Sequence, residues 1–116
     1  MEVQALNSRG WFTMTEDLIA VLARRVMRWD VAPDRFLVGN RKWMPRWRFQ
    51  PDIRLEDAFR LLEAAAPQKY TLSCEGPDAF CVQVWIDGRT GKAQDRSKPR
   101  AITLAVCRAL QIEVHD

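Results

Sequence analysis

Apolar side chains recur at steps of three and four residues in three stretches of the chain, a pattern that predicts helices with one buried side. The first helix is expected to run from Met14 to about Asp30. The second is expected to begin after Asp52, which acts as its N-cap, and to end at Pro67. The third is expected to follow Ser97. The apolar stripes of these helices are Ile19, Leu22, Val26 and Trp29, then Leu55, Ala58, Phe59, Leu62 and Ala66, and finally Ile102, Ala105, Val106, Ala109 and Leu110.

Alternation of apolar and polar side chains predicts a β-hairpin between the second and third helices. Residues 70–74 alternate as a half-buried strand does, and residues 76–78 supply a turn. The next strand, residues 80–86, is apolar on both faces, so we expect it at the centre of a sheet with cover on both sides. A turn over residues 87–91 then leads to a short strand near residues 92–95.

Aromatic and basic side chains alternate over residues 43–49, which indicates a further strand between the first two helices. Pro45 confines such a strand to a sheet edge or a bulge. One interpretation places Trp43 and Trp47 in the core and the intervening arginines in solvent, and the alternation favours it. The other interpretation is a surface for single-stranded nucleic acid, because aromatic faces stack on bases and guanidinium groups contact phosphates.

The positive charge of the chain is concentrated in two stretches. The net charge is only +3, yet residues 35–54 hold six basic residues against one aspartate, a local charge of +5. Residues 88–100 hold five basic residues against one aspartate, a local charge of +4. Such patches favour an anionic partner. The candidate residues for binding nucleic acid or another partner are Lys42, Trp43, Arg46, Trp47 and Arg48, with Lys98 and Arg100 in support.

The predicted elements define an α/β (α+β) sandwich. A small, mostly antiparallel sheet of three to four strands packs with three helices, in the order α-β-α-β-β-(β)-α. A length of 116 residues fits one domain, which we assign to residues 14–116, and residues 1–13 are expected to be a flexible N-terminal extension. No apolar run is long enough to cross a membrane and no signal peptide is visible, so we expect a cytoplasmic protein.

Few side chains suit catalysis or metal binding. The single histidine, His115, is next to the last residue, where a positioned general base is not expected. The three cysteines lie in apolar patterns without the paired spacing of zinc modules. Pairing the apolar faces of the hairpin places Cys81 on the opposite side of the sheet from Cys74, which argues against a disulfide. Glu56 and Asp57 are interpreted as acids that favour a helix N-terminus. We therefore expect no enzyme, no metal and no cofactor.

Three segments in this order resemble the phage ABA sandwich domain family: residues 23–29 (ARRVMRW) at the end of the first helix, residues 49–53 (FQPDI) before the second, and residues 104–110 (LAVCRAL) in the third. The resemblance runs from about residue 14 to residue 112. It implies a sheet flanked by helical layers, and a protein of tailed phages or prophages without a settled activity. It therefore predicts a small, non-catalytic accessory protein of the bacterial host's cytoplasm that binds a host or phage macromolecule.

The alternative is a nucleic-acid-binding domain. From Asp52 onward the predicted order of helix, three strands and helix is that of double-stranded-RNA-binding domains. Residues 96–101 (RSKPRA) look loosely like the basic start of the last helix in those domains, which points cations at phosphates. This alternative uses the tryptophan and arginine strand together with the basic start of the third helix.

Overall fold

The computed structural model describes residues 14–39 and 41–114, and this part of the chain contains three α-helices and two three-stranded antiparallel sheets. These elements confirm the predicted α+β class. The extension expected over residues 1–13 lies outside the described residues. The elements are α1 (Met14–Arg25), β1 (Asp30–Val31), β2 (Arg35–Gly39), β3 (Lys42–Pro45), the 3-10 helix η1 (Arg46–Arg48), α2 (Leu55–Ala65), β4 (Lys69–Cys74), β5 (Phe80–Ile86), β6 (Arg89–Asp95) and α3 (Lys98–Ala109).

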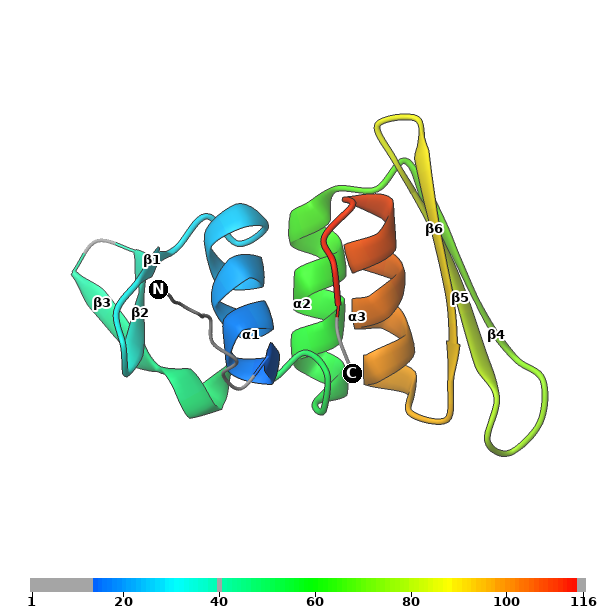
Figure 1. The fold of residues 1–116 in the computed structure, drawn as a ribbon, viewed down its shortest axis with the longest axis horizontal. Coiled ribbons are helices and arrows are strands. Elements are labelled where there is room, and N and C mark those ends of the chain that lie inside the picture. Colours follow the sequence, from blue (N-terminus) through cyan, green and yellow to red (C-terminus); the bar gives the residue numbers. More distant parts are fainter. Residues whose placement is uncertain (1–13, 40, 115–116) are drawn as a thin grey trace, which may run out of the picture.

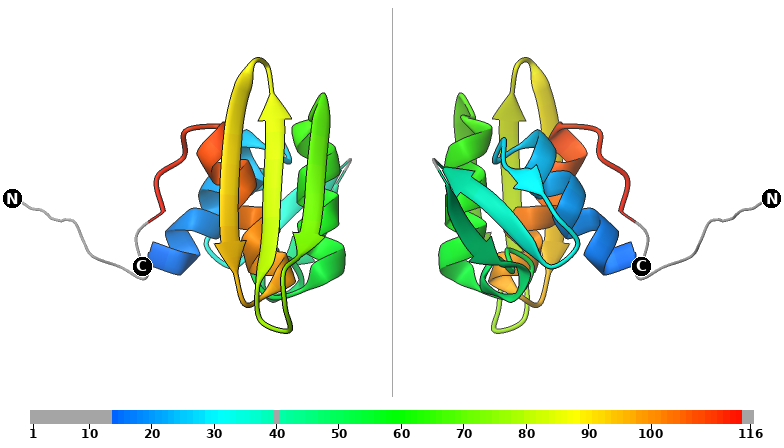
Figure 2. Two further views of the ribbon diagram at one scale, coloured as in Figure 1. Left: turned by 90° about the vertical axis from the view of Figure 1, so that its right-hand side faces the viewer. Right: turned by 90° about the vertical axis from the view of Figure 1, so that its left-hand side faces the viewer.

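The helices lie between the two sheets. In Figure 1 the sheet of β1, β2 and β3 forms one end of the molecule, the helices follow, and the sheet of β4, β5 and β6 forms the other end. This arrangement differs from a sheet flanked by helical layers, which the family resemblance implies. Figure 2 shows the outer face of the β4–β6 sheet without a covering layer.

The strand over residues 80–86 is central, as predicted, but it is not covered on both sides. β5 lies between β4 and β6. Val82, Val84 and Ile86 on its inner side are buried, whereas the alternate residues on the outer side, Trp85 among them, are only half-buried. A single aromatic side chain held on an otherwise polar face produced the two-sided apolar pattern in the sequence.

The predicted register of the hairpin is confirmed. Tyr70 pairs with Val84 and Leu72 pairs with Val82, so the apolar sides of β4 and β5 coincide. Cys81 lies opposite Ser73 on the other face of the sheet, as expected. β6 is longer than the short strand predicted near residues 92–95, because it begins directly after a two-residue turn.

The ends of the helices follow local backbone signals. α1 ends at Arg25, four residues earlier than its apolar stripe suggests, and Arg28 adopts a left-handed φ of 63° just beyond it. α2 ends before Pro67, as predicted. α3 begins after Ser97, whose side chain accepts a hydrogen bond from the Arg100 backbone N–H at 3.3 Å. This bond is the N-cap that the sequence predicts.

The start of α2 differs from the prediction. Asp52 is not the N-cap: it lies in the turn before the helix, and Arg54 holds the cap position without a side-chain hydrogen bond. Asp57 instead accepts a hydrogen bond from the Gln50 backbone N–H at 2.9 Å. Its side chain is only 3% exposed, so Asp57 is a structural carboxylate as well as a first-turn acid. The predicted stripe is correspondingly shifted, and Leu55 is exposed.

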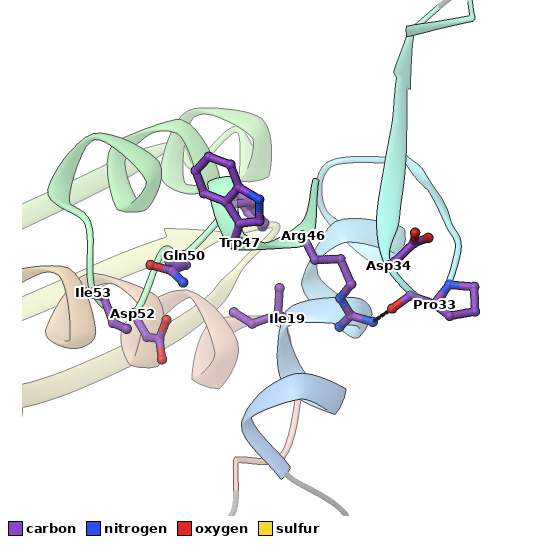
Figure 3. Close-up of a pocket in the computed structure, with 9 residues that line it drawn as sticks. Ile19, Pro33, Asp34, Arg46, Trp47, Gln50, Asp52 and Ile53 are labelled. Atoms are coloured by element: carbon purple, nitrogen blue, oxygen red, sulfur yellow. Dashed lines mark hydrogen bonds between the residues drawn. The ribbon is translucent and has the colours of Figure 1, made fainter. Parts of the chain in front are cut away.

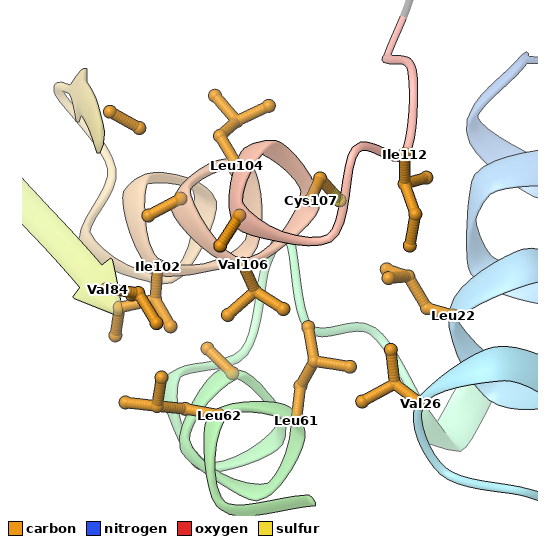
Figure 4. Close-up of a cluster of buried hydrophobic side chains, with 14 of the residues drawn as sticks. Leu22, Val26, Leu61, Leu62, Val84, Ile102, Leu104, Val106, Cys107 and Ile112 are labelled. Atoms are coloured by element: carbon orange, nitrogen blue, oxygen red, sulfur yellow. The ribbon is translucent and has the colours of Figure 1, made fainter. Parts of the chain in front are cut away.

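One apolar core joins the helices to both sheets. Figure 4 shows Leu22 of α1 and Val26, just beyond this helix, facing Leu61 of α2 and Ile112 beyond α3. Val84 extends this core into the second sheet. Each of these side chains is at most 7% exposed, so the two ends of the molecule share a continuous interior.

Candidate binding surface

The predicted aromatic strand is interrupted at Pro45. β3 pairs only with β2 and is therefore an edge strand, as the proline requires. Because Pro45 has no backbone N–H and a fixed φ, here −59°, the chain leaves the sheet and enters η1. The alternation over residues 43–49 thus spans two different backbone conformations.

Both tryptophans are exposed, so their interpretation as core residues is wrong. The exposed fractions are 46% for Trp43 and 65% for Trp47. Trp43 stands on the outer side of the edge strand, and Trp47 lies in the 3-10 turn that follows Pro45. Phe49 occupies the core in their place: its ring centroid lies 5.0 Å from that of Trp29 and 6.2 Å from that of Phe36, in edge-to-face contacts.

Trp43 borders a cavity of about 440 Å³, which we call the Trp43 pocket. Three cationic side chains line it: Lys42, Arg48 and Arg60. No carboxylate is among the described residues that line it. Its remaining walls are apolar or aromatic and comprise Trp29, Val38, Met44 and Pro45. The pocket therefore combines a positive potential with flat apolar surfaces, and its volume suits a small organic group.

A fourth cation, Arg35, contacts the ring of Trp43. The Arg35 guanidinium carbon lies 4.3 Å from the ring centroid, within the range of a cation–π contact. Arg35 and Trp43 belong to paired strands, so the contact joins β2 to the edge strand β3. It orients the indole and adds positive charge beside the pocket.

Trp47 borders a different cavity of about 420 Å³, which we call the Trp47 pocket (Figure 3). Its charged lining consists of two carboxylates, Asp34 and Asp52, and the guanidinium of Arg46. Its other lining residues are Ile19, Pro33, Phe49, Gln50 and Ile53. The two pockets therefore lie on either side of η1 with opposite balances of charge.

Arg46 stabilises the fold of this region. Its Nη1 donates a hydrogen bond to the Pro33 carbonyl oxygen at 3.4 Å (Figure 3), and its guanidinium carbon lies 5.4 Å from the centroid of the Phe36 ring. Its backbone N–H donates to the Asp34 carbonyl oxygen at 3.2 Å. These contacts attach η1 to the loop between β1 and β2, so Arg46 positions Trp47.

Lys98 and Arg100 are not brought to the tryptophans. In Figure 1, α1 and α2 lie between β3 and α3. The Lys98 Nζ lies 5.3 Å from the centroid of the Phe80 ring, and the Arg100 Nε lies 3.3 Å from Asp95 Oδ2. Both side chains are half-buried and attach the start of α3 to the second sheet.

The Trp43 pocket includes residues that the sequence analysis did not select. Arg60 lies on α2, twelve positions beyond Arg48, and its Nη1 is 3.7 Å from the buried Asp57 Oδ1. Trp29 was interpreted as the last core position of the first helix. Only the α2 packing brings Arg60 to this cavity. The exposed position of Arg60 on the helix was the one feature that could have indicated its role in this pocket.

One buried thiol has a shifted pKa. Burial raises the pKa of the Cys107 thiol to about 12, which makes it a poor nucleophile. Residues 14–39 and 41–114 contain no group of three or more His, Cys, Asp or Glu side chains able to hold a metal ion. His115 lies outside the described residues. The helices in this part of the chain are all too short or too polar to cross a membrane.

The arrangement of helices and sheets is similar to that of a phage protein of known structure. The crystal structure of a phage protein from Bacillus cereus ATCC 14579 superimposes with a TM-score of 0.69 and 15% sequence identity, over 96% of this chain and 100% of that chain. At this identity the similarity concerns the fold. No protein-family profile and no curated protein matches the sequence. The resemblance to phage proteins is therefore supported by the fold, without assignment to a family.

Proposed function

We propose that this chain is a non-catalytic phage or prophage accessory protein that binds single-stranded nucleic acid through the Trp43 pocket and Trp47. The observation that carries the proposal is the exposure of Trp43 at a cavity lined by three cations, with a second exposed tryptophan, Trp47, four residues further along the chain. Large aromatic side chains gathered at an exposed cavity are typical of an interaction site.

The chemistry of the pocket matches the two parts of a nucleotide. The indole rings offer faces on which unpaired bases stack, and Lys42, Arg48 and Arg60 offer charges for phosphates. Trp43 and Trp47 are four residues apart, so their Cα atoms are at most about 14 Å apart. A strand of a few nucleotides therefore spans both. A duplex keeps its bases stacked on one another and gains less from exposed indoles.

Duplex RNA is the less favoured ligand, although the expected topology is present. α2, β4, β5, β6 and α3 follow one another in the order of a double-stranded-RNA-binding domain, and both helices lie on one face of the antiparallel sheet (Figure 2). Lys98 and Arg100, however, contact Phe80 and Asp95. Cations engaged within the fold contribute less to phosphate binding than exposed ones.

A second candidate function is binding of a host or phage protein at the Trp47 pocket. Trp47 and Ile53 are 65% and 64% exposed on its rim, and Asp34 and Asp52 give it carboxylates. This lining suits a partner segment that presents an apolar side chain beside a basic one. Such a partner would leave the Trp43 pocket free.

Tryptophan fluorescence, titrated with oligothymidylate and with a duplex of the same length, tests the proposal. We expect saturable quenching by the single strand, weaker quenching by the duplex, and a steep loss of affinity with salt. Trp43→Ala should weaken single-strand binding roughly tenfold, since a stacked base contributes about 1–3 kcal/mol. Trp85→Phe, on the outer face of the second sheet, is the control and should bind normally. Absence of quenching at low salt would contradict the proposal and favour a protein partner.

A further inference from the structure

Three of the four sheet edges in the described structure are protected against pairing with another strand, and β4 is the exception. β1 has only two residues, and β3 contains Pro45. On β6, the Arg108 Nη1 donates a hydrogen bond to the Lys92 carbonyl oxygen at 2.7 Å. β4 has six exposed residues, no proline and an uninterrupted register with β5. Proteins normally protect such an edge, because its unpaired backbone groups accept a further strand.

The hydrogen bonds between β4 and β5 show which backbone groups face this free edge. The Glu75 N–H donates to the Ala79 carbonyl oxygen at 2.8 Å, so Glu75 directs its backbone groups toward β5. Because these groups alternate along an antiparallel strand, Ser73 and Thr71 also face β5. The N–H and C=O groups of Tyr70, Leu72 and Cys74 consequently face away from β5. They form the unpaired edge.

We infer that β4 pairs antiparallel with β4 of a second copy of this chain, about a two-fold axis at Leu72. In this register Leu72 lies opposite Leu72 of the partner subunit, and Tyr70 lies opposite Cys74 of the partner subunit. Every N–H at the free edge then finds a carbonyl oxygen. The result is a continuous antiparallel sheet of twice the width, with an interface that uses the same surface on both copies.

The side chains of β4 are complementary in this register. Lys69 lies opposite Glu75 of the partner subunit, and the symmetry repeats this ion pair. Thr71 lies opposite Ser73 of the partner subunit, a pair that hydrogen-bonds across strands. Like charges at these two positions would repel each other across the interface. The charge complementarity therefore favours a second copy as the partner of this edge.

Pairing would also cover the apolar side of β4. Tyr70 is 48% exposed and Leu72 is 37% exposed in the single chain. Figure 1 shows β4 inclined away from α2 toward its carboxyl end, which leaves this side of the strand without helical cover. The register keeps the apolar sides of both strands on the same face, so these side chains bury one another. The inference does not depend on nucleic-acid binding.

Sedimentation equilibrium over a range of protein concentrations tests the inference. We expect a monomer–dimer equilibrium and no larger species, because each copy has one unprotected edge. Leu72→Glu should produce a monomer, since it places two carboxylates opposite each other at the axis. Gln94→Glu, the same charge change on β6, is the control and should leave the dimer intact. Far-ultraviolet circular dichroism of both variants verifies that they fold.

A charge exchange identifies the register. Lys69→Glu and Glu75→Lys should each weaken the dimer roughly tenfold, and the double variant should restore it. Within one chain these residues lie at opposite ends of β4, so recovery can arise only across the interface. A monomer at every concentration would overturn the inference. So would a dimer unaffected by Leu72→Glu, or a double variant as weak as either single one.

Discussion

The two ends of the molecule use their basic residues in opposite ways. At the β4–β6 end, Lys98 lies over Phe80 and Arg100 pairs with Asp95, so both cations hold α3 to the sheet. At the β1–β3 end, Lys42 and Arg48 line a cavity beside an exposed Trp43. The two basic stretches are similar in the sequence, yet Lys98 and Arg100 of the second are engaged within the fold, whereas Lys42 and Arg48 of the first line a cavity.

The two basic stretches differ in the carboxylates that lie beside their cations. Asp95 immediately precedes the start of α3, where it accepts a hydrogen bond from the Ser97 backbone N–H at 2.9 Å and pairs with Arg100. In the Trp43 pocket no carboxylate of the described residues lines the cavity. Arg60 is the exception among the three lining cations, because its Nη1 lies 3.7 Å from Asp57 Oδ1, a carboxylate outside the lining. The positive charge of Lys42 and Arg48 retains its potential toward a ligand. A cluster of basic residues in a sequence therefore indicates a binding surface only when it is known which of them pair with carboxylates inside the fold.

The largest expected effect is the loss of the aromatic cluster that supports the β1–β3 end. Phe49→Ala removes the ring that packs against Trp29 and Phe36, and should lower the free energy of unfolding by about 3–5 kcal/mol. Trp47→Ala, two residues away but exposed, should cost less than about 1 kcal/mol. Urea denaturation measures both. Equal losses would mean that Trp47 also belongs to the core and that this end presents no aromatic surface.

At the β4–β6 end, the close contact between α3 and β6 stabilises the fold, as the aromatic cluster does at the β1–β3 end. A Cβ at Gly91 would fall on the backbone of Ala105 and Ala109, so Gly91→Ala should destabilise the protein by about 3 kcal/mol. Gly39→Ala is the matched control, because no atom lies within 4 Å of the added Cβ. Thermal unfolding compares the two. If Gly91→Ala unfolds like the parent protein, the packing of α3 on this sheet is incorrect.

The buried carboxylate beneath the Trp43 pocket should matter more than its exposed neighbour. Asp57→Ala leaves the Gln50 N–H without its acceptor and should cost about 2 kcal/mol. Glu56→Ala removes only an exposed ion pair with Arg54 and should cost less than about 1 kcal/mol. Urea midpoints of the two variants test this difference. A reversed order would make Asp57 an ordinary first-turn acid.

At neutral pH the Cys107 and Cys74 thiols provide the smallest effects, and at alkaline pH Cys107 adds a pH dependence. The folded protein raises the pKa of Cys107 from 9.0 to about 12 through burial. Above pH 9 the unfolded chain loses this proton while the folded chain keeps it, so the free energy of unfolding should fall by about 1.4 kcal/mol per pH unit between pH 9 and 12.

The slope should be smaller in Cys107→Ala than in the parent protein over the same range. A thiol reagent at neutral pH should modify the exposed Cys74 quickly and Cys107 only on unfolding. Rapid modification of Cys107 in the folded protein would show that α3 is not packed as described.

Local sequence patterns correctly predicted those helices and strands in which every residue of the pattern has the same backbone conformation. The hairpin register followed from alternation over residues 70–74 and 80–86, and the start of α3 followed from Ser97. The exposure of Trp47 could not be predicted in this way, because the alternation was counted through Pro45 into a 3-10 turn. The start of α2 was displaced because Asp57, inside the helix, accepts the Gln50 backbone N–H, and α1 ended early where Arg28 adopts a left-handed φ.

The layer order and the complete pocket depend on contacts between distant segments. Nothing in the sequence indicates that the helices lie between two sheets instead of flanking one. Only the packing of α2 places Arg60 beside Lys42 and Arg48. The candidate site was therefore found in part: Trp43, Trp47, Lys42 and Arg48 were selected, and Arg60 and the half-buried Trp29 were not.

The salt dependence of single-strand binding, measured on two charge-reversed variants, tests the central claim most directly. Lys42→Glu/Arg48→Glu changes the Trp43 pocket, and Arg89→Glu/Lys92→Glu makes the same change in net charge on exposed positions of β6. With three cations at phosphates, the parent protein should show a slope of log affinity against log salt of roughly −2. The first variant should lose most of this slope and most of its affinity, and the second should retain both. Equal losses in the two variants would contradict a binding site at the β1–β3 end.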